Sequence, residues 1–462
     1  MYTLPKDFKV RNITASEINT IIDYNEKHKR RYKRLNDYYM GVHAIFDRVK
    51  ENDGLKNNKV MVNHAKYITD TNVGYLLGNP VDYQVGTDDE GNPLYDIQPL
   101  LNAYKKQTIN DLDCEIAKDV SILGLQYEYV YANEDAEPKS CRIDNENCII
   151  VYDDTVEHNK LFAVIYRAIY KGDIFKYWDV ILVDKEVERH YHSTTKSVTK
   201  VEEERPHAFG DVPVIMYKNN PELLGDFEPV ISLIDAYNLL QSDRVNDKEQ
   251  LVDAILCMYG IDFDTEQANM LKESRMLANI PADARVEYLV KVLQEADVDI
   301  LRQTIEADIH KISMVPNMAD KEFANNSSGV AIKYKLLSFE QNIKNKERYM
   351  EKGLAERFEL YNHYLVTKSQ MQEVPAEEVD IVFKRNLPSN DYETSQMINN
   401  LADFVDSETL VSQLSFVKDA SEIVELKRKE EELKPKDQYD LNFINNESFD
   451  ANKVQDDIQD KE

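Results

Sequence analysis

Residues 315–366 read VPNMADKEFANNSSGVAIKYKLLSFEQNIKNKERYMEKGLAERFELYNHYLV, and this stretch decides the fold. From Leu336 onward its apolar residues recur at steps of three, four and seven, which is the period of one face of an α-helix. A helix of about 38 residues, rising about 1.5 Å per residue, is roughly 57 Å long. The apolar stripe that we expect to face the core consists of Leu336, Phe339, Ile343, Met350, Leu354, Phe358, Tyr361 and Leu365.

The residues before this helix predict a flexible loop that leads into it. Ser327 or Ser328 can cap the first turn, because a serine oxygen accepts hydrogen bonds from N–H groups that have no partner within the helix. Gly329 adds backbone freedom at the point where the loop meets the helix. A long rod with a loop at its tip is more typical of a large assembly than of a compact enzyme.

The totals indicate a globular chain with more than one structural unit. The chain has 462 residues, of which 31% are charged and 42% hydrophobic. This length suggests two to four units. No apolar run approaches the roughly 20 residues that a membrane span needs, and the N-terminal residues lack a secretory signal. We therefore expect synthesis inside the cell and no membrane partner.

The formal net charge of −29 argues against a protein that grips nucleic acid. Such proteins carry basic surfaces, because their affinity comes from displacing the counterions of the phosphates. An acidic surface past which DNA moves without adhering remains compatible with this charge. Acidity that serves only solubility is the alternative that the charge alone leaves open.

Linear spacing predicts no metal centre and no cofactor. Cys141 and Cys148 do not match a common zinc spacing, and the acidic turn at 86–93 lacks the pattern of a calcium loop. His190 and His192 share one face of a predicted strand and could bind a metal, but no third ligand follows at a convincing spacing. We therefore favour hydrogen-bonded histidines there.

The rest of the chain alternates between helical and strand-rich regions. Residues 16–40, 63–79 and 98–120 have helical patterns, whereas residues 121–214 are rich in tyrosine and β-branched residues, with a strand about every ten residues. This spacing predicts an antiparallel meander.

Two further helices bracket a small insert in the second half. The first starts near Asp226 and runs to about Cys257, and the second covers 297–315. A strand then follows the long helix at 379–387, a helical set covers 391–433, and the polar end of the chain is typical of disorder. The first helix of the pair carries the acidic residues Asp226, Glu228, Asp235, Asp243, Asp247, Glu249 and Asp253.

Common catalytic motifs are absent from the sequence. It contains no phosphate-binding G-x-x-x-x-G-K-[ST], no H-E-x-x-H and no G-x-S-x-G. Their absence disfavours an enzyme only weakly, because many active sites leave no linear signature.

Four blocks of sequence, in order, carry a family resemblance. They are NVGYLLGNPVDYQ at 72–84, NNPELLGDFEPVISLIDAYNLLQSDRVNDK at 219–248, MADKEFANNSSGVAIKYKLL at 318–337 and FKRNLPS at 383–389. With these blocks the chain resembles the portal, or head-to-tail connector, proteins of long-tailed double-stranded-DNA phages of Gram-positive bacteria. The resemblance covers about residues 20–430, and the second and third blocks are its most specific parts.

This resemblance implies an α+β, mainly helical portal fold with a wing, a stem, a clip and a crown. The corresponding expectations are a wing at 1–222, stem helices at 223–257 and 297–315, a clip at 258–296, a tunnel loop at 316–328, the long helix with a returning wing strand at 329–389, a crown at 390–433 and an acidic disordered tail at 434–462.

The resemblance also implies a function. Portal proteins form a ring, typically a dodecamer, at one vertex of the capsid, and double-stranded DNA passes through it without sequence specificity during packaging and ejection. The implied partners are copies of the chain itself, terminase, head-completion or adaptor proteins, and major capsid and scaffolding proteins. The implied location is the virion, and the host cytoplasm during assembly. No catalytic role is implied.

Candidate site residues follow from this map. In the tunnel loop, the resemblance implies DNA-facing roles for Lys321, Phe323, Asn325 and Asn326, although Phe323 could instead anchor the loop against a helix. We expect Gly329 to be the hinge of this loop. We further expect the stem acids Asp243, Asp247 and Asp253 to face the duplex and to keep it from adhering.

Two other functions remain as alternatives. A helical intracellular scaffold or assembly protein would assemble without a central channel. An enzyme, such as a nuclease or a terminase subunit, would cleave DNA or hydrolyse ATP.

Overall fold

The structure is a computed structural model, and the chain divides into two compact units, Met1–Asn386 and Leu387–Glu462. The residues that it describes are 2–49, 56–88, 92–193, 198, 201, 203–252, 255–259, 285–289, 295–318, 334, 336–385, 391–402, 404–412, 414, 417 and 420–433.

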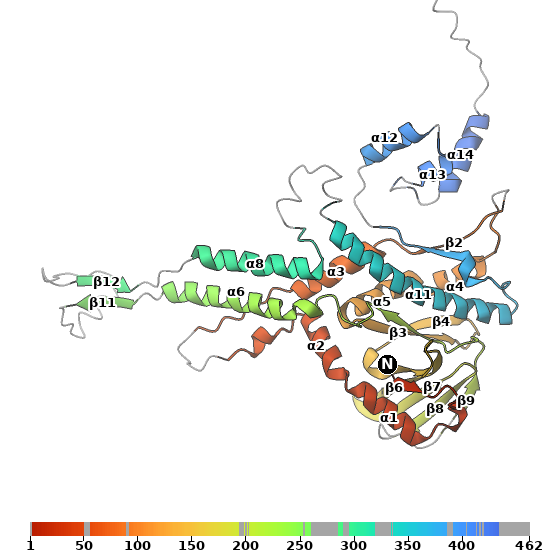
Figure 1. The fold of residues 1–462 in the computed structure, drawn as a ribbon, viewed down its shortest axis with the longest axis horizontal. Coiled ribbons are helices and arrows are strands. Elements are labelled where there is room, and N and C mark those ends of the chain that lie inside the picture. The colour runs from red at the N-terminus through yellow and green to blue at the C-terminus, as the bar shows by residue number, and fades with distance from the viewer. Residues whose placement is uncertain are drawn as a thin grey trace, which may run out of the picture. The chain divides into compact units, whose positions relative to one another are not determined.

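A six-stranded sheet is the largest β-structure of the first unit (Figure 1). Its strand order is β1-β5-β6-β7-β8-β9. The pairs from β5 to β9 are antiparallel and follow chain order, as in a meander, whereas β1 joins β5 in parallel. The single meander predicted over residues 121–214 is therefore confirmed only in part, because the first two strands and the last strand of that region form a sheet of their own. The strands are Tyr2–Leu4 (β1), Cys148–Asp153 (β5), Lys160–Lys171 (β6), Ile174–Val183 (β7), Val187–Ser193 (β8) and Glu203–Pro206 (β9).

A second sheet, of order β10-β3-β4, packs against one face of the first. Its strands are β10 (Val214–Lys218), β3 (Leu125–Ala132) and β4 (Pro138–Ile143). Successive side chains of a strand point to opposite faces, so Val214 packs between the sheets, whereas Ile215 and Tyr217 pack against helices. The layers of this region are therefore helix, sheet, sheet and helix.

Two patterns that we predicted as single helices are each broken in two. Residues 16–40 form α1 (Ala15–Glu26) and α2 (Lys29–Tyr39), because α1 packs on the outer face of the large sheet whereas α2 packs in the helical core. Residues 98–120 form α4 (Gln98–Lys106) and α5 (Ile109–Leu123). At this second break the Gln107 side chain donates to the Tyr361 hydroxyl at 2.7 Å.

The long helix α11 spans Leu337–Thr367 and carries the apolar stripe that we predicted to face the core. Every residue of that stripe is buried. The N-cap residue Leu336 makes no side-chain capping bond, and the expected helix start and serine caps at 327–333 lie outside the described residues. The helical core that receives α11 also contains α3 (His64–Leu77).

A buried charge cluster connects this helix to three other elements. Arg357 of α11 is fully buried. Its Nη1 donates a hydrogen bond to Oδ1 of Asp113 on α5 at 2.6 Å. Its Nε and Nη2 donate hydrogen bonds to the Glu128 carboxylate on β3 at 2.8 and 2.9 Å. The hydroxyl of Tyr217 on β10 donates to the same carboxylate at 2.6 Å. Burial raises the pKa of Asp113 even beside Arg357. The cluster therefore depends on the arginine.

The helix predicted from Asp226 to Cys257 is shorter in the structure. A 3-10 turn at Glu228–Val230 precedes α6 (Ile231–Val252), and Ile255–Tyr259 form strand β11, which pairs with β12 (Arg285–Leu289). The pairing partner lies far away in sequence, so local helical periodicity could not show it. The second helix, α8, spans Glu295–Ser313.

Further elements complete the description. Strand β13 (Val379–Val382) returns to pair with β2 (Asp82–Val85), and the second unit contains α12 (Asp391–Leu401), α13 (Ser407–Val411) and α14 (Ala420–Leu433). The α+β, mainly helical fold class is confirmed. Among the described residues, no helix combines the length and apolarity that crossing a membrane requires. The remaining 3-10 turns are Val10–Asn12, Ala44–Asp47, Asn145–Asn147 and Ala376–Glu378.

Candidate functional site

Helices α6 and α8 form an antiparallel pair, seen side by side in Figure 1. Near the end of α6, Lys248 Nζ lies 2.6 Å from a Glu295 carboxylate oxygen at the start of α8. Arg244 lies 3.5 Å from Asp299 and 3.7 Å from Glu295. The end of α8, in turn, contacts the 3-10 turn that precedes α6. We call α6 and α8 the stem helices, after the part of the portal fold that the sequence resemblance implies for them.

A row of polar side chains fixes α6 against residues 56–63, which we call the strap. Asn246, Ser242 and Asn238 accept hydrogen bonds from the backbone N–H groups of Asn58, Val60 and Val62, at 2.7, 2.9 and 2.8 Å. The acceptors are four residues apart on the helix, which is a rise of about 6 Å, and the donors are two residues apart on the strap, which is about 6.6 Å of extended chain. Donors and acceptors therefore lie opposite one another. We call these three side chains the polar ladder.

Aromatic rings pack where the stem helices meet the rest of the unit. The ring of His64 on α3 lies against Tyr237 of α6 and His310 of α8, with centroids 4.8 and 5.8 Å apart. Burial lowers the pKa of His64 to about 4, so this histidine is neutral at physiological pH. The Tyr67 hydroxyl donates to the Pro316 carbonyl at 2.9 Å, which attaches the chain just after α8.

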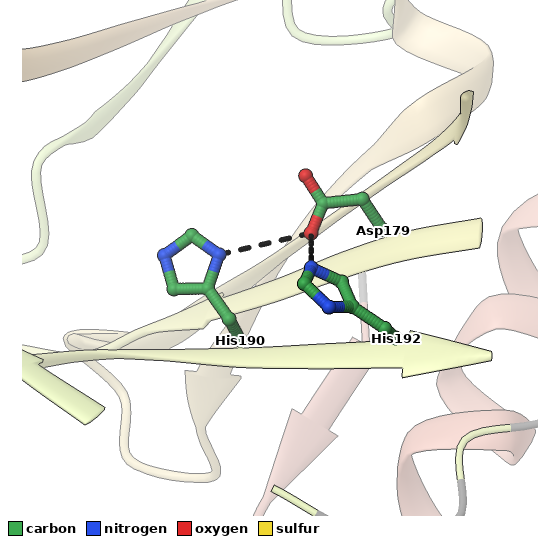
Figure 2. Close-up of side chains that lie close together, drawn as sticks. All are labelled: Asp179, His190 and His192. Carbon is green, nitrogen blue, oxygen red and sulfur yellow. Dashed lines mark ion pairs between the residues drawn. The ribbon is translucent and has the colours of Figure 1, made fainter. Parts of the chain in front are cut away.

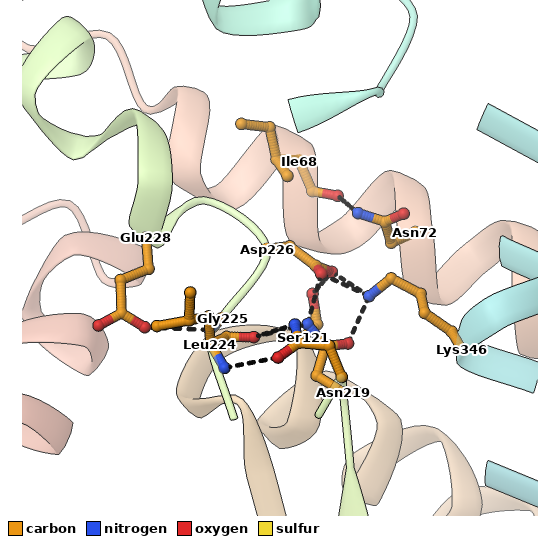
Figure 3. A network of polar contacts seen from close by, with 10 residues as sticks. Ile68, Asn72, Ser121, Asn219, Leu224, Gly225, Asp226, Glu228 and Lys346 are labelled. Atoms are coloured by element: carbon orange, nitrogen blue, oxygen red, sulfur yellow. Dashed lines mark hydrogen bonds and ion pairs between the residues drawn. The ribbon is translucent and has the colours of Figure 1, made fainter. Parts of the chain in front are cut away.

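The turn that leads into α6 holds a buried ion pair, shown in Figure 3. Lys346 Nζ of α11 lies 2.5 and 2.6 Å from the two carboxylate oxygens of Asp226 and 2.6 Å from Oδ1 of Asn219. Ser121 of α5 donates to the same carboxylate at 2.5 Å. We call Ser121, Asn219, Asp226 and Lys346 the junction. It connects the long helix and α5 to the start of the stem.

Two glycines allow the chain to approach itself at the junction. Gly124 has a φ of +87°, and a Cβ there would lie 2.1 Å from the Leu223 carbonyl oxygen. A Cβ on Gly225 would lie 2.2 Å from the Ile122 carbonyl oxygen. Arg31 of α2 closes the turn from outside, because its Nη2 donates to the Leu223 carbonyl at 2.7 Å and to Glu228 at 2.6 Å. The block at 219–248 therefore has a structural role.

The predicted site residues fall into two groups. Asp243 lies on α6, is partly exposed, and accepts a hydrogen bond from Arg48 Nη2 at 2.7 Å, so its charge is compensated within the chain. Asp247 lies one turn further along and is partly exposed. The other predicted residues, Lys321, Phe323, Asn325, Asn326, Gly329 and Asp253, lie outside the described residues.

Sequence reasoning missed the polar ladder and the junction. Asn238, Ser242 and Asn246 repeat at every fourth residue, and this repeat was a usable signal for a polar face that seeks partners. The pairing of Lys346 with Asp226 had no such signal, because the two residues are 120 positions apart.

Comparisons with known proteins agree with this architecture. The sequence model of the family described as phage portal protein, SPP1 Gp6-like, matches residues 18–436. The portal protein of Bacillus phage SPP1 is 25% identical over 438 residues, which cover 88% of this chain and 82% of that protein. The portal protein of Clostridium phage phiCD119 is 20% identical over 457 residues, covering 90% and 96% of the two chains.

These matches place the chain in the class of phage portal proteins and confirm the resemblance seen in the sequence. Within that class, it belongs to the SPP1 Gp6-like family. The chain is thus a structural component of the virion, a head-to-tail connector that acts as a conduit for DNA at a capsid vertex. Membership of this family implies in general a ring of identical subunits that associates with the capsid or with terminase.

Proposed function

We propose that copies of this chain close into a dodecameric ring whose channel is lined by the stem helices. The observation that carries this proposal is the antiparallel pair α6 and α8, which is fixed to the body of the unit by the polar ladder, the aromatic cluster and the junction. A helix pair fixed at its root suits the wall of a tunnel through which a long polymer moves.

We assign the parts of the chain as the family resemblance implies. The wing is 1–222, the clip is 258–296, the tunnel loop is 316–328 and the crown is 390–433. The pairing of β13 with β2 supports a returning wing strand within 329–389, and the pairing of β11 with β12 supports a clip that extends beyond the stem helices. Lys321, Phe323, Asn325 and Asn326 remain our candidates for contacts with DNA, with Gly329 as their hinge.

Negative-stain electron microscopy of the purified chain tests the ring. We expect annular particles of about twelve wedge-shaped subunits with a central hole wide enough for a B-form duplex. Rods, monomers or particles without a hole would favour the scaffold alternative. Cleavage of DNA or hydrolysis of ATP by the same preparation would favour the enzyme alternative.

The charge of the chain supports a channel to which DNA does not adhere. Each subunit carries a formal net charge of −29, and the duplex carries one negative charge per roughly 1.7 Å of axis. Repulsion between the two prevents the counterion release that makes DNA bind tightly. We therefore propose that Asp243, Asp247 and Asp253 face the duplex, although Arg48 offsets part of the Asp243 charge.

Charge reversal at these stem acids is expected to slow DNA packaging. The triple variant Asp243→Lys, Asp247→Lys and Asp253→Lys should lower the packaging velocity in a reconstituted reaction, because each lysine adds an attraction to phosphate that grows at low salt. The triple asparagine variant should have a smaller effect, since it removes repulsion without adding attraction.

A matched control separates the position of the charges from their number. Glu134→Lys, Asp135→Lys and Asp173→Lys change the net charge equally, but they lie on exposed turns of the wing. This control should package at the wild-type velocity. Equal velocities for the stem variant and the wild type would contradict an acidic lining, while leaving the ring itself untouched.

Docking partners belong to the same proposal. We assign the clip to the contact with terminase during packaging and with head-completion or adaptor proteins afterwards. We assign the outer parts of the ring to contacts with the major capsid and scaffolding proteins. Assembly then takes place in the host cytoplasm, before the portal vertex becomes part of the finished virion.

A further inference from the structure

Three potential metal ligands meet on the large sheet of the wing, away from the stem (Figure 2). They are Asp179 on β7 and His190 and His192 on β8, and their ligand atoms all lie within 4.8 Å of one another. Oδ1 of Asp179 lies 3.4 Å from Nε2 of His192 and 3.7 Å from Nδ1 of His190. The sequence showed the two histidines but not the third ligand.

Strand register brings the third ligand to the histidines. Asp179 lies directly opposite His192 in the antiparallel pair of β7 and β8. His190 is two residues before His192, so both histidines project from the same face of the sheet. Asp179 and His190 are eleven positions apart in sequence, and only the β7–β8 pairing makes this spacing meaningful.

The two distances from Asp179 to the histidines, 3.4 and 3.7 Å, are close to those around a tetrahedral ion. Metal–nitrogen and metal–oxygen bonds of about 2.0–2.1 Å at tetrahedral angles place ligand atoms about 3.4 Å apart. Asp179 is 4% exposed, and its Oδ1 makes only the longer contacts to the two histidines, without a hydrogen bond of good geometry. An ion between these three atoms would bind the buried carboxylate oxygen more closely than the histidines do.

The ligands are themselves held by neighbouring side chains, as those of metal sites usually are. Glu188 Oε1 lies 2.5 Å from Nε2 of His190, which leaves Nδ1 of that ring directed toward Asp179. Arg167 donates twice to Oδ2 of Asp179, at 3.0 and 2.9 Å, which leaves Oδ1 for a ligand. His190 also lines a cavity of about 960 Å³, which gives an ion a route from solvent.

We propose that Asp179, His190 and His192 bind one divalent transition-metal ion of the zinc type, with water in the fourth position. Two imidazoles and one carboxylate form a ligand set that suits zinc better than magnesium or calcium. The ion would clamp β7 to β8 in the wing, a role separate from the conduit.

Cobalt binding to the purified chain tests this proposal. The untagged full-length protein is dialysed against EDTA, transferred to chelator-free buffer and titrated with Co²⁺. We expect the intense visible absorption of four-coordinate cobalt, saturating at one ion per chain and lost when Zn²⁺ is added. His192→Gln and Asp179→Asn should abolish the signal, and Glu188→Gln should weaken binding about 10–100-fold.

The controls make the result decisive. His158→Gln changes an exposed histidine outside the cluster and should bind cobalt like the wild type. His192 is partly exposed, so its glutamine variant should keep the wild-type circular dichroism spectrum. A four-coordinate signal that survives in folded His192→Gln would overturn the proposal. So would a wild-type chain that shows only the faint absorption of octahedral cobalt, because the cluster would then be an ion-pair group that holds a proton.

Discussion

A chain in which methionine replaces Arg357 is expected to lose about 3–5 kcal/mol of unfolding free energy. The substitution keeps much of the apolar volume but leaves Asp113 and Glu128 buried without their cation. Removing one partner of a buried ion pair costs more than the pair itself contributes, because the remaining charge stays desolvated. Urea unfolding followed by circular dichroism, at one fixed protein concentration, measures the loss.

Two further variants distinguish the effect of the lost charge from the effect of the lost side chain. Arg348→Met on the exposed side of the same helix should stay within about 0.5 kcal/mol of the wild type. Arg357→Lys should remain strongly destabilised, since an ammonium group cannot reproduce the forked contacts to Asp113 and Glu128. The deficit of the methionine variant should shrink at acidic pH, because burial raises the pKa of Asp113 and its carboxyl group then takes up a proton more readily in the folded state than in the unfolded one. A deficit that does not change with pH would argue against this account.

The Lys346→Met variant is expected to lose about 3 kcal/mol of unfolding free energy, the lower end of the range for a broken buried pair. Asp226 would remain buried, although Ser121 and Asn219 would still donate hydrogen bonds to it. Because the junction holds the turn at 219–228 against α5 and α11, limited proteolysis should cut this turn faster in the variant than in the wild type.

A double variant identifies the cause of that loss. Adding Asp226→Asn to Lys346→Met removes the uncompensated charge, so the pair of substitutions should recover a large part of the stability lost by the single one. Lys344→Met, two residues away on the exposed side of α11, serves as the control and should behave like the wild type. If the double variant is no more stable than Lys346→Met, packing rather than charge holds the junction.

Local pattern predicted those parts of the fold that depend on one face of one element. The buried stripe of α11 and the strands of the meander follow from periods that a single segment displays. The break between α1 and α2 at Lys27 and the break between α4 and α5 at Gln107 do not follow from such periods. Each depends on what the flanking helices contact. The helix predicted to about Cys257 runs into strand β11 for a similar reason, since the partner of that strand lies beyond an insert.

The site was less predictable than the fold, for two physical reasons. The stem acids were visible as charges, but the compensation of Asp243 by Arg48 joins residues 195 positions apart. The third potential metal ligand, Asp179, depends on strand register, which a linear spacing rule does not contain. The resemblance to portal proteins supplied the function, and neither composition nor periodicity could have supplied it alone.

The polar ladder has a consequence for how the stem helix is held. From one side chain of the ladder to the next, the helix advances about 6 Å, whereas its partners in the strap advance about 6.6 Å. The donors and acceptors therefore move out of register by about 0.6 Å per step. Over three hydrogen bonds the mismatch reaches about 1.2 Å, which side-chain torsions absorb, whereas over five or six it would exceed the tolerance of a hydrogen bond. A polar ladder of this kind can therefore extend over only a few hydrogen bonds. It sets the rotation of α6 about its axis between Asn238 and Asn246 and leaves the ends of the helix to be positioned by their neighbours.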